Sequence, residues 1–159
     1  MQVGSQWYNR IATEIAQFQT TLGPKSARKY KLDLFLRIAK RVDDFSQTCA
    51  ECQALKQEIT GLVQESAMLI QMPNKTGLKN HTTSLNKMAE HLKKVHKLVD
   101  KGHYLGMGVG IGMAVGAGIG SALGAAVDNP GIGTAVGVAL GVAIGLYLDR
   151  KARQEGRMI

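Results

Sequence analysis

The fold of this 159-residue chain is decided by residues 104–148, which read YLGMGVGIGMAVGAGIGSALGAAVDNPGIGTAVGVALGVAIGLYL. These 45 residues hold 13 of the 19 glycines and one charged side chain, Asp128. The uncharged runs 104–127 and 131–148 are separated by Asp128-Asn129-Pro130. As helices they would measure about 36 and 27 Å, against a membrane hydrocarbon core of about 30 Å. Because proline interrupts helices and favours chain reversals, the stretch predicts a transmembrane hairpin of two helices over residues 103–148.

The glycines of this stretch recur at every fourth residue, which places them in one stripe along each helix. The two stripes are Gly108, Gly112, Gly116, Gly120 and Gly124, followed by Gly133, Gly137, Gly141 and Gly145. A stripe without side chains lets two helices approach closely, and close approach is how helices gain contacts in lipid. In water each glycine costs a helix about 1 kcal/mol relative to alanine. A membrane hairpin is therefore favoured over a buried Gly/Ala-rich hairpin inside a soluble protein.

Basic and aromatic residues flank the hairpin. An excess of Lys and Arg marks the cytoplasmic side of a membrane, and tyrosines are enriched at the membrane–water interface. The residues predicted to lie at this interface are Lys97, Lys101, Tyr104, Tyr147, Arg150 and Lys151. The sequence thus predicts a protein with two membrane-spanning helices, both termini in the cytoplasm, and a basic tail over residues 149–159.

The repeated Gly-x-x-x-Gly pattern resembles the glycine-zipper two-helix membrane segments of several bacterial envelope and pore-related families, and of the cristae-shaping proteins of mitochondria. The resemblance covers residues 106–145. It implies close helix packing and leaves the function open.

Residues 1–102 are basic and predicted to be helical. They contain 16 Lys and Arg against 9 acidic residues, which gives a formal charge of +7. Apolar spacing predicts helices over about 5–22, 26–72 and 76–102, with Gly23-Pro24 and Pro73-Asn74 ending the first two. We expect an antiparallel coiled coil or small bundle facing the cytoplasm, whose third helix continues directly into the first membrane helix. The fold class is therefore all-α.

Cys49 and Cys52 have the C-x-x-C spacing used for thiol exchange or for half of a zinc site. Both cysteines fall on the apolar seam in the middle of the predicted helix 26–72, so a packed pair of thiols is favoured over metal or redox chemistry. No metal ligand and no cofactor is predicted. If the long helices pair around the turn 72–77, Cys52 faces about His96 and Lys97, and a Cys-Cys-His set is then geometrically feasible.

The histidines are not predicted to be metal ligands. His81 lies on the apolar seam of the third predicted helix and is expected to be a polar core residue. His91 and His96 are expected to be solvated, and His103 to lie at the membrane boundary.

The sequence contains no catalytic constellation, so we predict that the protein is not an enzyme. The basic run 28–41 favours anionic lipid over nucleic acid, since no recognition motif accompanies it.

The predicted function is a membrane-anchored oligomerisation or scaffold protein, either a homo-oligomer or a subunit of a membrane complex, that presents its basic domain to a partner. A pore-forming or membrane-perturbing protein is the first alternative, and it ranks lower because few residues of the hairpin, such as Ser121, Asp128 and Thr134, are polar. A lipid- or quinone-handling subunit is the second.

Overall fold

The computed structural model describes the backbone of residues 5–124 and 131–159, and the side chains of 5–119 and 133–159. The described part of the chain contains six helices, which confirms the all-α prediction. It divides into two compact units, one up to Lys97 and one from Leu98 to Met158. The predicted turn at Asp128-Asn129-Pro130 lies outside the described residues, and so does Ser121.

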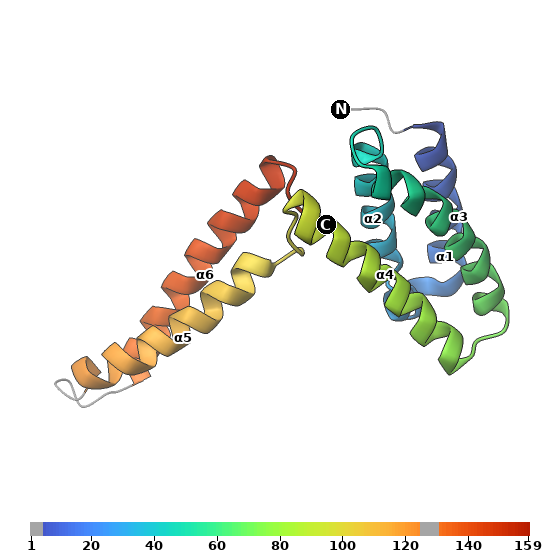
Figure 1. Cartoon of the computed structure of the whole chain (residues 1–159). Helices are drawn as coiled ribbons and strands as arrows, with labels where there is room; N and C mark the ends of the chain where they lie inside the picture. Colours follow the sequence, from blue (N-terminus) through green and yellow to red (C-terminus); the bar gives the residue numbers. More distant parts are fainter. Residues whose placement is uncertain (1–4, 125–130) are drawn as a thin grey trace. The chain divides into compact units, whose positions relative to one another are not determined.

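The first unit is a bundle of four helices, α1 (Gln6–Lys29), α2 (Leu32–Phe45), α3 (Ala50–Gln71) and α4 (Lys75–His96) (Figure 1). Helices α2 and α3 each contact the other three helices of the bundle. Apolar side chains from all four helices are fully buried between them, as expected for amphipathic helices. The largest of these are Ile11, Ile15, Leu32, Phe35, Ile38, Val42, Ile59, Val63, Leu85, Met88 and Leu92.

The predicted break after the first helix is present. Gly23 has φ 70° and ψ 171°, which interrupts the helical conformation inside α1. Glycine adopts this positive φ at little cost, and Pro24 then starts a short helical continuation that ends at Lys29. At the other end of the helix, the Ser5 hydroxyl accepts a hydrogen bond from the Tyr8 N–H at 3.2 Å.

The prediction of one helix over residues 26–72 is wrong, because the chain breaks twice within it. The first break is at Lys31, whose φ of 51° is left-handed. The second spans residues 46–49, where the Ser46 hydroxyl donates to the Asp43 carbonyl at 2.8 Å and Cys49 adopts an extended conformation as the N-cap of α3. Short polar side chains favour such caps and turns over helix interiors. Cys49 and Cys52 therefore lie at the beginning of a helix and not in the middle of one.

The predicted direct continuation from the third helix into the membrane hairpin is also wrong. Helix α4 ends at His96, and Lys97 caps it in a left-handed conformation with φ 56°. A left-handed residue ends a helix by turning its N–H back to a free carbonyl, here that of Leu92. Gly102, with φ 79°, precedes the next helix.

The second unit consists of α5 (His103–Gly124) and α6 (Gly131–Gln154), which pack against each other in antiparallel orientation (Figure 1). The segments outside these helices are also joined, because the Val99 N–H donates to the Arg157 carbonyl at 2.8 Å. The basic residues Lys101, Arg150 and Lys151, which flank the helix pair in the sequence, consequently belong to one compact unit, whereas Lys97 belongs to the first.

Candidate functional site

The two helices of the second unit contact each other through their glycines. Gly108 lies against Gly141 and Gly145, Gly112 against Gly137 and Gly141, and Gly116 against Gly133 and Gly137. A Cβ atom built on Gly116 would lie only 2.9 Å from the Gly133 carbonyl oxygen. Backbone therefore packs directly on backbone, which only glycine permits at this separation. We call these seven residues the glycine interface.

The structure thus brings seven of the nine predicted packing glycines together within one chain. The surroundings of Gly120 and Gly124 lie outside the described residues. By contrast, Gly106, Gly110 and Gly118 have nothing within 4 Å of an added Cβ. The fourfold stripe, and not glycine content as such, determines which residues lie in the contact.

The outer surfaces of α5 and α6 are apolar. Large apolar side chains are 42–66% exposed on both helices, and they are Met107, Ile111, Met113, Val115, Ile119, Val136, Leu140, Ile144, Leu146 and Tyr147. Exposed apolar surface of this extent is typical of contact with lipid or with another protein.

Among the described residues, one helix is long and apolar enough to cross a membrane, Gly133–Gln154, and only 11% of its apolar window is buried. The described apolar part of α5, His103–Ile119, is shorter. The prediction of two membrane-spanning helices is therefore not supported by this criterion.

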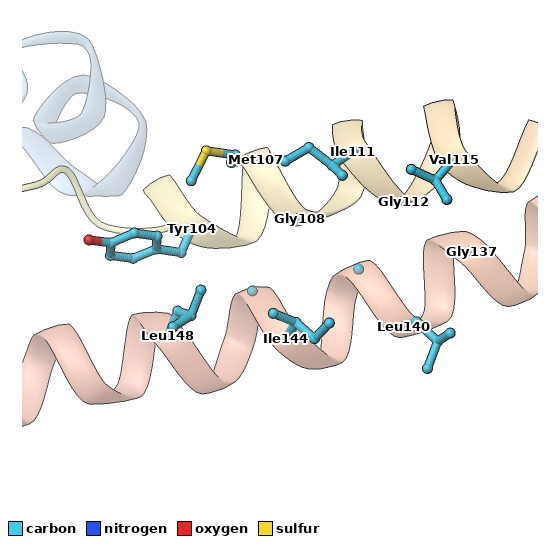
Figure 2. Close-up of a pocket in the computed structure, with 12 residues that line it drawn as sticks. Tyr104, Met107, Gly108, Ile111, Gly112, Val115, Gly137, Leu140, Ile144 and Leu148 are labelled. Carbon is cyan, nitrogen blue, oxygen red and sulfur yellow. The ribbon is translucent and has the colours of Figure 1, made fainter. Parts of the chain in front are cut away.

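An apolar groove of about 270 Å³ runs along the helix pair. Figure 2 shows Met107, Ile111 and Val115 of α5 on one side and Leu140 and Ile144 of α6 on the other. Glycines of both helices, with Tyr104 and Leu148, complete its lining. The absence of glycine side chains therefore creates both the close helix contact and the groove beside it.

The predicted interface tyrosines lie at one end of the pair, since the Tyr104 carbonyl contacts Gly145, two residues before Tyr147. Asp149, which sequence analysis placed in the tail, accepts hydrogen bonds there from the backbone N–H groups of Tyr104 at 3.1 Å and Leu105 at 3.3 Å. These groups begin α5 and would otherwise lack partners. An acidic residue directly after the uncharged run 131–148 was the signal, because carboxylates favour helix N-termini.

The predicted basic flanks are partly assembled at this end. Lys101 and Arg150 line one cleft together with Asp149 and Arg153. Lys151 is exposed on the last turn of α6, and Lys97 is the exposed cap of α4.

A second cluster of functional groups lies in the bundle, where α3 begins and α4 ends. It consists of Cys49, Cys52, His91 and His96, whose sulfur and ring nitrogen atoms all lie within 4.8 Å of one another. We call these four residues the Cys/His cluster. The two cysteines are free thiols. The Nε2 atom of His91 lies 3.6 Å from Cys49 Sγ and 3.4 Å from Cys52 Sγ, and Nε2 of His96 lies 3.2 Å from Cys52 Sγ.

Neighbouring side chains fix the orientation of both imidazole rings. The Glu51 carboxylate lies 3.0 Å from Nδ1 of His91, whose side chain is only 7% exposed. The ring of His96 is stacked on Phe45, with a centroid distance of 3.9 Å and an interplanar angle of 14°. Each histidine is therefore held with Nε2 toward the sulfur atoms.

Burial sets the protonation states in this cluster. It raises the pKa of the Cys52 thiol to about 12, and the neighbouring Cys49 acts in the same direction. Burial also lowers the pKa of His96, with a further contribution from His91. The protein alone thus favours a neutral Cys52 thiol and a neutral His96 imidazole.

The structure corrects the prediction that His91 and His96 are solvated. That prediction failed because the register of α3 against α4 was not known, although the approximate pairing of Cys52 with His96 was correct. The prediction for His81 is confirmed. It is 3% exposed and directs Nε2 at the Tyr30 carbonyl at 2.9 Å and Nδ1 at the Ser66 hydroxyl at 3.2 Å.

Three of the six basic residues in the run predicted to bind anionic lipid are paired within α2. Arg37 contacts Asp33, and Asp44 contacts both Lys40 at 2.6 Å and Arg41 at 3.3 Å. Such i,i+3 and i,i+4 pairs stabilise a helix modestly. They also reduce the positive charge that this helix offers to a partner.

Comparisons with protein families, with curated proteins and with solved structures found no match for this chain.

Proposed function

We propose that α5 and α6 insert together into a lipid bilayer and anchor the helical bundle at its surface. One observation carries this proposal. The glycine interface buries the small faces of the two helices against each other, while large apolar side chains remain exposed on the outside. A helix pair that is apolar on its outer surface is unfavourable in water and favourable in lipid.

The lengths of the helices agree with insertion of both. Helix α5 has 22 residues, or about 33 Å, and the uncharged part of α6, residues 131–148, corresponds to about 27 Å, against about 30 Å of hydrocarbon. The glycine interface also gives α5 a partner along its length. We therefore propose two spans, with α5 held in the membrane by α6.

The polar groups at one end favour its placement at the headgroups. Asp149 satisfies two N–H groups at the start of α5, and unsatisfied backbone groups cost several kcal/mol in hydrocarbon. Lys101, Arg150 and Arg153 lie around this carboxylate. The positive-inside rule then places this end, and both chain termini, on the cytoplasmic side, where anionic lipid attracts each basic residue by about 1 kcal/mol.

Self-association through the glycine stripes is now less favoured as a function of this protein. The stripes contact each other within one chain, so the anchoring role and the presentation of the bundle to a partner no longer depend on a homo-oligomer. The apolar groove makes the lipid-handling alternative more attractive than a pore, because a groove lined almost entirely by hydrocarbon suits an acyl chain better than water.

The experiment compares alkaline extraction of membranes that contain the full chain or either of two double variants. In Leu140→Lys/Ile144→Lys the charges lie on the exposed apolar surface of α6, and in the control Met68→Lys/Met72→Lys they lie on exposed positions of the bundle. Each lysine in the centre of a membrane helix costs about 2.5–3.5 kcal/mol. We expect the wild type and the control to stay in the membrane and the α6 variant to be released. Release of the wild type would reject anchoring.

Protease digestion distinguishes two spans from one. Peptide tags fused to both ends of the chain should be cut together in inside-out vesicles and be protected together in right-side-out cells. Cutting of only one tag in either preparation would reject the second span and leave α6 as a single anchor.

A further inference from the structure

We propose that the Cys/His cluster binds one zinc ion, with Cys49, Cys52, His91 and His96 as its four ligands. The inference is independent of membrane anchoring, since all four residues belong to the helical bundle. The site joins the first turn of α3 to the last two turns of α4. Its role is structural, because four protein ligands complete a tetrahedral zinc site and leave no position open for a substrate.

The distances between the ligand atoms agree with tetrahedral coordination. Zinc lies about 2.3 Å from thiolate sulfur and about 2.0–2.1 Å from imidazole nitrogen, so tetrahedral angles separate sulfur from nitrogen by roughly 3.5 Å. The three sulfur–nitrogen distances are 3.6, 3.4 and 3.2 Å. These three separations thus need to change by only a few tenths of an ångström to hold the ion, and the remaining pairs of ligand atoms lie within 4.8 Å.

The spacing of the ligands along the chain supports the same assignment. Two residues separate Cys49 from Cys52, and four separate His91 from His96. These are the C-x-x-C and H-x₄-H spacings found in structural Cys₂His₂ sites. The halves of such a site are usually joined by a short segment, whereas here the long hairpin of α3 and α4 brings them together.

The surroundings of the cluster bury its side chains and hold them in place. Cys52 is fully buried and the His91 side chain nearly so. Glu51 holds Nδ1 of His91 at 3.0 Å, which is the carboxylate–histidine arrangement that orients zinc-bound imidazoles. The remaining ring, that of His96, is held by stacking on Phe45. Glu51 and Phe45 therefore position both nitrogen ligands before any ion binds.

Zinc is the ion that this donor set favours. Two thiolates and two imidazoles in tetrahedral arrangement suit zinc, whereas magnesium and calcium require oxygen ligands. Binding converts two thiols to thiolates, so each zinc ion releases two protons and the site becomes electrically neutral. Closing a connection of 38 residues between Cys52 and His91 also restricts the unfolded chain, which stabilises the folded bundle.

The experiment measures metal content and cobalt spectra on the full chain, purified in detergent under reducing conditions. Elemental analysis should give one zinc ion per chain. Cobalt in its place should show the strong visible absorption of a tetrahedral ion and sulfur-to-cobalt charge transfer. Cys49→Ser/Cys52→Ser should lose both signals, and His103→Gln, the matched control outside the cluster, should keep them.

Two further variants keep the test decisive if the double cysteine variant fails to fold. His91→Gln and His96→Gln each remove one nitrogen ligand, and each should weaken zinc binding and shift the cobalt absorption. Unchanged binding in both would reject the ligand assignment. Folded wild-type chain that takes up no zinc during titration would leave a packed thiol pair and overturn the site, and stoichiometric iron would overturn the identity of the metal.

Discussion

Adding a single methyl group should have different effects at two glycines, Gly110 and Gly112, that lie two residues apart on α5. Gly112 lies in the glycine interface, and a Cβ atom added to it would lie 3.1 Å from the carbonyl carbon of Gly137 and closer still to its oxygen. A Cβ atom added to Gly110 has nothing within 4 Å. Gly112→Ala and Gly110→Ala therefore make the same chemical change in the same helix, inside and outside the interface.

The size of the free-energy cost depends on the atoms that the added methyl group contacts. At Gly112 the neighbouring atoms are backbone, which cannot rotate away, so the helices must separate. Overpacking of this kind costs about 1–3 kcal/mol. The gain in helix propensity from glycine to alanine, up to about 1 kcal/mol in water, is common to both variants and cancels in the comparison. The α5–α6 contact in Gly112→Ala should therefore be weaker than in Gly110→Ala by about 1–3 kcal/mol, or roughly 5- to 150-fold in an opening equilibrium.

Hydrogen exchange measured by mass spectrometry on the full chain in detergent micelles reports this opening. Peptides that cover residues 105–119 and 133–145 should exchange roughly 5- to 150-fold faster in Gly112→Ala than in Gly110→Ala. Peptides from the bundle serve as the internal control and should be unaffected in both variants. Equal exchange in the two variants, or faster exchange in Gly110→Ala, would refute the proposed register of the glycine interface.

Three further predictions concern single residues. Replacing Glu51 by Gln should weaken zinc binding by about 10- to 100-fold while leaving the four ligands in place, because it removes the group that orients a ligand; unchanged affinity in a competition titration would count against that role. Burial lowers the pKa of His81 below its usual 6.5, opposed by the Tyr30 carbonyl and by Glu65, so its contribution to folding is complete above pH 6.5 and is lost as the pH falls further. The fluorescence of Trp7, the only tryptophan, should show the wild-type melting temperature falling more steeply between pH 7.5 and 5.5 than that of His81→Gln, whereas parallel curves would contradict the argument. Asp149→Ala should cost about 0.5–2 kcal/mol, as the loss of an N-cap does, and should raise exchange at the first amides of α5, with no rise expected in the control Glu155→Ala.

The bundle shows which features of the fold a sequence determines locally. Gly23-Pro24 ended a helix as predicted, since a positive φ and a missing N–H act within one turn. The breaks at Lys31 and at residues 46–49 were not predicted, because the apolar spacing continues through both. Apolar periodicity records which residues face the core, and it does not show where one helix ends and the next begins. The capping residues Ser46 and Cys49 carried the missing information.

The Cys/His cluster shows the same limit for a functional site. The pairing of Cys52 with His96 followed from folding two helices about the turn at 72–77, and it was correct. The participation of His91 was missed because the register of α3 against α4 was not known and because Cys49 and Cys52 were placed in the middle of a helix. Once Cys49 is recognised as the first residue before α3, the C-x-x-C pair lies at a helix start and the H-x₄-H pair at a helix end. Two short spacings then indicate one site, although neither did so alone.

The glycine stripes pose the opposite problem, because their spacing predicts close packing without identifying the partner. A stripe on one helix fits equally well a second copy of the chain or the other helix of the same hairpin. In this chain the second stripe is connected to the first by a few residues, so the contact within the chain has a much higher effective concentration than any contact between chains. The glycine interface is consequently used for folding the second unit. A partner of this protein in the membrane would have to contact the residues that remain outside, which are the exposed valine, isoleucine, leucine and methionine side chains and the groove between them.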